Sequence, residues 1–219
     1  ASSRSTTPSS PQTPRPLQAP SQQPIPGADQ ELSSVVLTTA EVSRAGIPVS
    51  GGLYRGGTSV KGQKTLDECG ASYPSEAKRV ARIQTGYVAL SDPHGSQVAS
   101  NEVVRYSHGG AAQAYTEIKK SLKNCPAHFA DGGKAVGSNT TIEPTDAELT
   151  HDQVTATQLV TIGKQRIWSS ITFLYDGDLF SGVYVFRPTR SAALAAGHVL
   201  AAISTKKLAT AVAAEGTLV

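Results

Sequence analysis

The sequence lacks methionine altogether, and it has only two cysteines and 5% aromatic residues in a chain of 219. Because an intact reading frame starts with methionine, we expect that the N-terminus has been processed or trimmed. No apolar run approaches the roughly 18 residues that a membrane-spanning helix needs, and no secretory signal peptide is present. The 38% hydrophobic content is nevertheless enough for one domain with its own core.

Dense positive charge is also missing. The formal net charge is +3, and the closest approaches to a basic patch are two short groups, Lys78-Arg79 with Arg82 and Lys119-Lys120 with Lys123. Isolated groups of this size are typical of an ordinary solvated surface. A phosphate-tracking surface needs a denser stripe of Lys and Arg. We therefore expect no nucleic-acid partner.

Motifs for phosphate, metal or nucleophilic chemistry are absent. The glycine-rich segment 50–62 does not match the G-x-x-x-x-G-K-[ST] spacing, and we interpret it as an irregular or edge segment. Asp176, Gly177 and Asp178 lack the closing glutamate of a calcium loop. The five histidines accompany neither a G-x-S-x-G elbow nor an H-E-x-x-H motif. We predict no catalytic residue, no metal and no cofactor.

The first 28 residues form a compositionally distinct segment. They hold seven of the 13 prolines, separated by Ser, Thr and Gln. Such a segment has little apolar surface to bury and cannot offset the entropy lost on ordering. We expect an extended, polyproline-like tether at 1–28, followed by a single globular domain at 29–215. A tether suits a protein held away from a membrane or cell wall, whereas an inert disordered end needs no anchor.

Residues 153–187 contain three strand-like runs joined by two tight turns, at Gly163-Lys164 and Asp176-Gly177. Asp-Gly between apolar runs is a strong hairpin signal, because a type I′ turn needs positive φ at both central residues. The apolar pattern selects two-residue turns, since a slip of one residue would move every side chain to the other face. The predicted pairs include Tyr175 with Asp178, Phe173 with Phe180, Ser169 with Tyr184, Gln158 with Ser169 and Val154 with Phe173.

In these registers the paired apolar residues all lie on one face of the three strands. A row of three polar residues, Gln158, Ser169 and Tyr184, crosses this face. Buried polar groups need partners. Either these three side chains satisfy one another or a water molecule, or they line a pocket. The opposite face mixes Ser and Thr residues with Trp168, and we expect it to be partly solvated, as antiparallel sheets often are.

The rest of the chain adds helices and two more strands. Thr38 and Glu41 have the spacing of a capping box, and Gly46 and Pro48 end the short helix that follows. The remaining predictions are strands at 79–90 and 98–107, a helix at 111–125, a long connection at 127–150 and a last helix that begins near Pro188. The stripe that packs this helix on the sheet is predicted to be Leu194, Ala195, His198, Val199, Ala202 and Ile203.

This order of elements predicts an α+β fold. An antiparallel sheet of about five strands would carry the helices, in the order α-β-β-α-β-β-β-α. Cys69 and Cys125 are expected to form one disulfide, because two cysteines in a tethered, apparently exported domain favour pairing. Cys125 lies on the helical stripe of Ala114, Ile118 and Leu122, which points its sulfur towards the core.

Four features together resemble a known group of proteins. They are LDECGASYPSEAKRVARIQ at 66–84, EVVRYSHGGAAQAYTEIKKSLKNCP at 102–126, the three-strand core and the polar N-terminal tether. They resemble secreted or lipid-anchored actinobacterial proteins whose globular part is similar to the extracellular sensor domain of the mycobacterial receptor serine/threonine kinase H. The resemblance covers roughly residues 31–213. This chain departs from the kinase sensor in having one possible disulfide instead of two, and it has no kinase motifs.

The resemblance implies an α+β domain with a cleft, located outside the cytoplasm, which binds a ligand. It also implies that the tether followed a lipidated cysteine that this chain lacks, so any membrane attachment would be through that anchor. The partner would be a small molecule, a lipid or a protein of the cell envelope.

The main functional hypothesis is a non-enzymatic extracytoplasmic ligand-binding or sensor-like domain. Its predicted ligand-binding residues are Gln158, Ser169 and Tyr184, with Trp168, Arg79, Arg82 and Arg105 as further candidates, because arginine pairs well with anionic groups. One alternative is a structural or protein-interaction module of the cell envelope, which a flat apolar patch around Trp168 and Val185 would favour. The other is a hydrolase, for which His108 is the candidate because it precedes a helix N-terminus.

Overall fold

The computed structural model describes residues 28–53, 60, 64–91, 97–131, 135–144, 149 and 152–216. The predicted tether, except for Ala28, lies outside the described residues. Eight strands form one antiparallel sheet in the order β1-β2-β3-β8-β7-β6-β5-β4, so the α+β class is confirmed while the expected number of about five strands is wrong. Among the described residues, no helix has both the length and the apolar character needed to cross a membrane.

The helices are α1 (Ala28–Val35), α2 (Thr39–Arg44), α3 (Gly110–Lys123) and α4 (Arg190–Gly216), with two 3-10 turns, η1 (Glu68–Gly70) and η2 (Pro74–Lys78). The strands are β1 (Val49–Leu53), β2 (Arg79–Ala89), β3 (Gln97–Tyr106), β4 (His128–Ala130), β5 (Ala135–Ile142), β6 (Gln153–Ile162), β7 (Gln165–Asp176) and β8 (Leu179–Arg187). The capping box of α2 is confirmed, since Thr38 accepts from the Glu41 amide and Glu41 accepts from the Thr38 amide.

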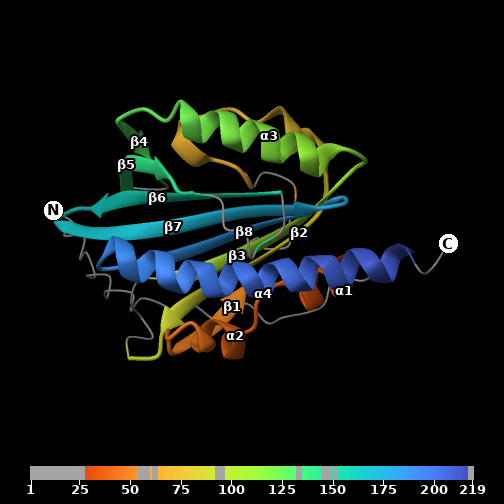
Figure 1. Cartoon of the computed structure of the whole chain (residues 1–219), viewed down its shortest axis with the longest axis horizontal. Helices are drawn as coiled ribbons and strands as arrows, with labels where there is room; N and C mark the ends of the chain where they lie inside the picture. Colours follow the sequence, from red (N-terminus) through yellow and green to blue (C-terminus); the bar gives the residue numbers. More distant parts are fainter. Residues whose placement is uncertain are drawn as a thin grey trace, which may run out of the picture.

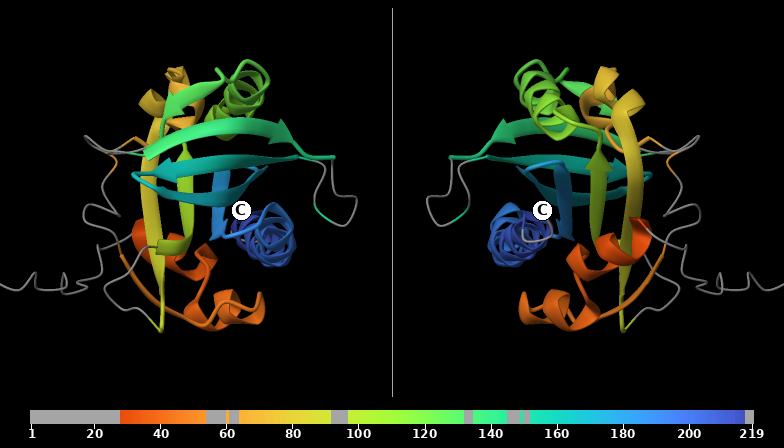
Figure 2. Two further views of the ribbon diagram at one scale, coloured as in Figure 1. Left: turned by 90° about the vertical axis from the view of Figure 1, so that its left-hand side faces the viewer. Right: turned by 90° about the vertical axis from the view of Figure 1, so that its right-hand side faces the viewer.

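Helices cover both faces of the sheet (Figure 1). Helix α3 and the two 3-10 turns lie on one face, called here the α3 face. Helix α4 packs along β7 and β8 on the other, called here the α4 face, together with α1 and α2. The end views show α3 and α4 on opposite sides of a strongly twisted sheet (Figure 2). Each face therefore encloses its own layer of side chains.

Three of the eight strands were not predicted. The region 127–150, expected to be a long connection, contains β4 and β5, and β1 occupies the start of the glycine-rich segment. Strand β5 reads AVGSNTTI and has a register shift between Ser138 and Thr141, where Asn139 has φ +54°. This bulge breaks the alternation on which strand prediction rests. The ring of Phe129 on β4 fills the space over Gly137, where a Cβ would lie 2.2 Å from it.

The first predicted hairpin is confirmed and the second is shifted. Gln158 pairs with Ser169 and Val154 with Phe173, as expected. In the second hairpin Asp176 pairs with Leu179, so the turn residues are Gly177 and Asp178, and Ser169 pairs with Phe186 instead of Tyr184. Only Gly177 of the two has positive φ, which suits a turn with glycine at its first central position. The shift is two residues, so the side chains keep their predicted face.

Most of the α4 face is buried, which corrects the expectation that it is partly solvated, and only Thr155, Thr161 and Trp168 among its predicted residues are half-buried. Ser170, Ser181 and Val185 are at most 1% exposed, because α4 lies over them. The helix contacts the sheet with small residues, and the predicted stripe is wrong: Ala193, Ala196, Gly197, Leu200, Ala201, Ser204 and Leu208 are buried, whereas Ala195 and His198 are exposed. An alanine-rich helix is apolar all round, so side-chain size determines which side approaches the sheet most closely.

Candidate ligand-binding site on the α3 face

The Cys69–Cys125 disulfide anchors the centre of the site. The predicted bond is present and joins the turn η1 to the end of α3, with the two Cα atoms 5.0 Å apart. Cys69 has φ +59°, a left-handed conformation that is unfavourable for residues other than glycine. The carbonyl of Glu68, the residue before it, accepts hydrogen bonds from the Tyr73 and Ser121 hydroxyls at 2.8 and 3.1 Å. The backbone of Glu68 is thus held from η2 and α3.

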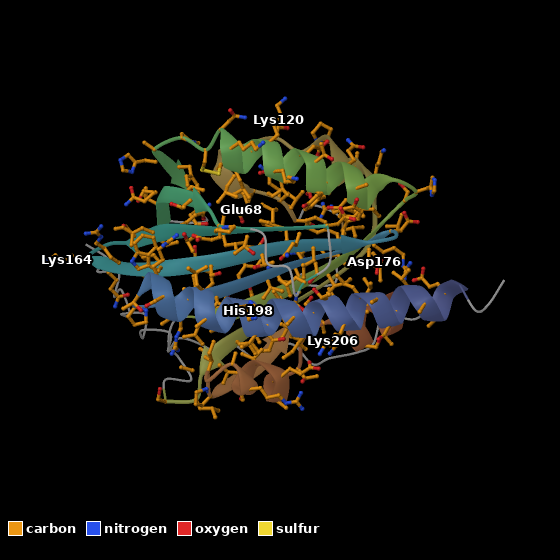
Figure 3. All side chains as sticks on the ribbon, viewed as in Figure 1. Glu68, Lys120, Lys164, Asp176, His198 and Lys206 are labelled. Carbon is orange, nitrogen blue, oxygen red and sulfur yellow. A yellow bond between two sulfur atoms is a disulfide. The ribbon has the colours of Figure 1, made fainter. Side chains whose placement is uncertain are left out.

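This anchoring directs the side chain of Glu68 into the layer between α3 and the sheet (Figure 3). Glu68 is 4% exposed. Burial raises the pKa of its carboxyl to about 8, and the negative charges of Asp67 and Asp131 add to this rise, against hydrogen bonds from Gln158 and Tyr184. Burial also raises the pKa of Asp131, with a contribution from Asp67. Glu68 is therefore mostly protonated at neutral pH.

Strands β6 and β7 supply the polar groups that face this carboxyl. Gln158 and Ser169 are both fully buried and form a cross-strand pair. The Gln158 Nε2 lies 3.5 Å from Glu68 Oε2, a long contact, and the Ser169 hydroxyl lies 3.4 Å from the Gln158 carbonyl. Among the described residues, the Gln158 Oε1 has no hydrogen-bond partner. A buried amide oxygen left in this state is costly, so this atom is a candidate to accept a hydrogen bond from a ligand.

Tyr184 reaches the same region because Gly182 has no side chain. A Cβ on Gly182 would lie 2.9 Å from the Tyr184 ring and 3.3 Å from its hydroxyl, so the ring lies over this glycine. It makes an edge contact with Phe173, with 5.9 Å between the ring centroids. Burial raises the pKa of the Tyr184 hydroxyl, and the charges of Glu68 and Glu102 raise it further. The phenol stays neutral and can donate one hydrogen bond.

A buried ion pair borders the site on β2 and β3. The Arg82 guanidinium donates to the Glu102 carboxylate, and the two side chains are 3% and 4% exposed. Arg82 also donates to Gln84 at 2.7 Å. Burial raises the pKa of Glu102 to about 7, against the opposing effect of Arg82. Arg79 lies nearby, where it pairs with Glu76 at 3.2 Å and donates to the Thr65 hydroxyl at 2.7 Å.

A cavity of about 600 Å³ opens beside these polar groups. Its walls are mainly apolar and come from β5 to β8, and its lining residues include Ala135, Val160, Ile162, Ile167, Phe186 and Pro188. Asp131, Gln97, Gln165 and Arg166 add polar groups. Val160, Ile167 and Phe186 stand two residues from Gln158, Ser169 and Tyr184 on their strands, and residues two apart share a sheet face. The cavity therefore continues the polar row along the α3 face.

The structure brings some of the predicted site residues together and separates others. Gln158, Ser169 and Tyr184 share the α3 face beside the cavity, although none of the three lines it. Arg79 and Arg82 also lie on this face, each already paired with a glutamate. Arg105 pairs with Glu215 of α4 at 2.6 Å, and Trp168 is next to Ser169 and so points to the opposite face. These two do not belong to the site.

Glu68 and Asp131 are the residues that sequence reasoning missed. Both lie in segments without strand or helix periodicity, so no pattern placed them. The sequence did contain one signal for Glu68, which is its position next to Cys69, a residue expected to form a disulfide in the core. Within the described ranges no group of three His, Cys, Asp or Glu side chains can hold a metal ion. The arrangement instead offers acceptors, the Gln158 Oε1 and two carboxyls, beside an apolar cavity.

Comparison with known proteins supports the fold. No family model matches the sequence, and no curated protein matches it. The crystal structure of the extracellular domain of PknH from Mycobacterium tuberculosis is similar, with a TM-score of 0.54 and 14% sequence identity over 84% of this chain and 97% of that chain. At this identity the similarity shows the fold alone. The PknH-like fold implied by the sequence resemblance is thereby confirmed.

Proposed function

We propose that this chain is a non-enzymatic, extracytoplasmic ligand-binding or sensor-like domain of a cell-envelope protein, and that its ligand occupies the cavity on the α3 face. The observation that carries the proposal is that an apolar cavity of about 600 Å³ lies on the same sheet face as buried polar groups, and that its lining residues Val160 and Ile167 stand two positions from Gln158 and Ser169. Small-molecule sites combine apolar walls with a few converging polar groups in just this way, at volumes of about 300–1,000 Å³. The extracytoplasmic location and a lipid anchor before the tether are parts of the proposal.

The shared fold with an extracellular domain of a kinase supports a sensor-like role. A protein-interaction module is less well supported, because the residues of the patch that would favour it are not exposed together: Val185 is fully buried under α4, and Trp168 is half-buried. A hydrolase has little support as well. His108, the candidate for it, is exposed and lies outside the cavity lining.

Native mass spectrometry tests the proposal directly. Protein purified from a host that exports it should carry an added mass that organic extraction removes. The variant Ile167→Trp should lose that mass, because the larger ring fills the cavity. The matched control is Val80→Trp at an exposed site, where Val80 is 54% exposed. An added mass that survives in Ile167→Trp would place the ligand elsewhere and contradict the proposal.

A further inference from the structure

We propose that the cavity takes an amphiphilic amine, with its apolar body against Val160, Ile167 and Phe186 and its protonated amino group directed at Asp131, Glu68 and the Gln158 amide oxygen. This inference rests on the proposed function and names the ligand class. It goes beyond a generic apolar ligand because two carboxyls, Glu68 and Asp131, lie at the polar end of the site, where the charge of Asp131 acts on Glu68.

Gln158 and Asp131 offer hydrogen-bond acceptors at that end, and Glu68 offers a further one once it is deprotonated. Gln158 is fully buried, its amide group faces Glu68, and its Oε1 has no partner within the described part of the chain. Asp131 lines the cavity, and its charge acts on the buried Glu68 carboxyl. Unsatisfied buried acceptors select a ligand with N–H or O–H donors, since leaving them unpaired costs free energy. An ammonium group has three such donors.

The charge of the site distinguishes an amine ligand from an alcohol ligand, although both can donate hydrogen bonds. The negative charges of Asp67 and Asp131 disfavour ionisation of the buried Glu68 carboxyl, and the charge of Asp67 disfavours ionisation of Asp131 in the same way. The guanidinium of Arg82 is already paired with Glu102. A bound cation would relieve the repulsion, and Glu68 would release its proton when the cation binds. Affinity for the amine should therefore rise as the pH rises through the range in which Glu68 titrates.

The groups around Glu68 come from every element packed against it. Asp67 is the N-cap residue of η1 and Tyr73 that of η2, Asp131 follows β4, and Gln158 and Tyr184 approach from β6 and β8. Helix α3 contributes the Ser121 hydroxyl to the Glu68 carbonyl. Lys64 and Arg82 lower the pKa of Asp67, against the larger effect of burial. The hydrogen-bond donors in this set that face the carboxyl, the Tyr184 hydroxyl and the Gln158 Nε2, already act on Glu68. The basic residue of the cavity lining is Arg166, which is exposed.

The test compares three probes that share one ten-carbon chain: decylamine, decanol and decanoate, titrated calorimetrically below their micelle concentrations. Decylamine stays protonated through pH 9, because alkyl amines such as the lysine side chain have a pKa of about 10.4. We expect it to bind at least about tenfold more tightly at pH 9 than at pH 6. At pH 9 it should also bind at least about tenfold more tightly than decanol or decanoate.

Three variants separate the charge from the cavity. Glu68→Gln should reduce decylamine affinity at pH 9 by at least about tenfold and remove its pH dependence, while decanol binding stays unchanged. Asp131→Asn should reduce decylamine affinity less, because Asp131 is only half-buried. Asp176→Asn is the matched control at the far turn between β7 and β8 (Figure 3) and should leave both affinities unchanged.

The outcomes distinguish the ligand class from the proposed function. Equal affinity for decylamine and decanol at pH 9 overturns the amine assignment but leaves a ligand-binding cavity. Preference for decanoate overturns it in favour of Arg166 and an anionic ligand. Absence of any probe binding, together with an apo mass in the native spectrum, rejects both proposals.

Discussion

The burial of Glu68 makes the folded protein hold a proton that the unfolded chain releases. Its pKa rises from 4.5 to about 8, so between these values the folded state binds more protons than the unfolded state. The free energy of unfolding therefore falls as the pH rises through this window. One pKa unit corresponds to about 1.4 kcal/mol, so the contribution of Glu68 amounts to a few kcal/mol.

Glu68→Gln should remove this contribution. We expect the variant to resemble the wild type at pH 4.5 and to be more stable at pH 9 by about 2–5 kcal/mol. Glu102, with a pKa raised to about 7, adds a decline of the same sign that both proteins retain. Urea unfolding at pH 4.5, 7 and 9 measures the difference, and a difference that does not change with pH would contradict the buried position of Glu68.

Arg82 and Glu102 give a second prediction at the scale of single residues. Glu102→Gln leaves the 3% exposed guanidinium of Arg82 without its carboxylate, and loss of one partner of a buried pair costs about 3–5 kcal/mol. The double variant Arg82→Met/Glu102→Leu should recover most of this loss, since no buried charge remains. Chemical denaturation of the three proteins measures both effects.

Arg190 and Glu143 form the control pair, because the Arg190 side chain is 41% exposed. Arg190→Met should cost less than Glu102→Gln, because Arg190 is partly exposed, although it leaves the 12% exposed Glu143 side chain without this guanidinium. Equal losses at the two sites would mean that Arg82 has access to solvent.

At the scale of elements, the close contact between α4 and the sheet depends on Gly197. A Cβ at this position would lie 2.6 Å from the Ser170 hydroxyl oxygen and 3.1 Å from its Cβ. Gly197→Val should therefore destabilise the protein by about 1–3 kcal/mol through overpacking, although glycine is the weaker helix former. Thermal unfolding measures this loss.

Ala195→Val on the exposed side of α4 is the matched control. It should cost less than about 0.7 kcal/mol, which is the range of intrinsic helix propensities. If the two substitutions cost the same, the helix does not pack against Ser170 through Gly197.

A comparison of the predicted and observed elements also shows which of them sequence patterns could predict. Strand-like runs joined by two tight turns predicted β6, β7 and β8, and the two-residue registers placed Gln158, Ser169 and Tyr184 on one face, which the structure confirms. The shift at the second turn could not be detected from the apolar pattern, because a register change of two residues leaves each side chain on the same face of the sheet. Strand β5 was not predicted, because its bulge interrupts the alternation of apolar and polar residues. The buried side of α4 was predicted wrongly, because it depends on which side chains are small enough to approach the sheet. A hydrophobic stripe in the sequence carries no information on side-chain size.

At the scale of the whole molecule, the site joins segments that are distant in the sequence. The turn η1 at Glu68 is held against α3 by the disulfide, while β4 brings Asp131 to the same face and β6 to β8 supply the wall. The sequence predicted the strand residues and the disulfide separately. That these residues meet at one site could not be predicted. Their meeting depends on the path of irregular segments across the sheet, and such segments have no hydrophobic periodicity in the sequence.

The disulfide should therefore control both stability and binding. Closing a 56-residue separation stabilises by about 4 kcal/mol in the chain-entropy model. The double variant Cys69→Ser/Cys125→Ser should lose about this much in urea unfolding, and the wild type with reductant should match it. Thiol labelling of the unfolded, unreduced wild type should detect no free cysteine.

Binding should weaken in the variant even at pH values where it remains folded. Cys69 holds its left-handed conformation under the constraint of the bond, and Glu68 takes its orientation from this residue. Without the bond, η1 can relax and the carboxyl can leave the layer under α3. Decylamine affinity at pH 9 should fall by at least about tenfold, since the charge partner is lost, while decanol affinity should change much less, because β6 to β8 build the apolar wall without η1. An equal loss for both probes would instead show that the disulfide supports the cavity itself.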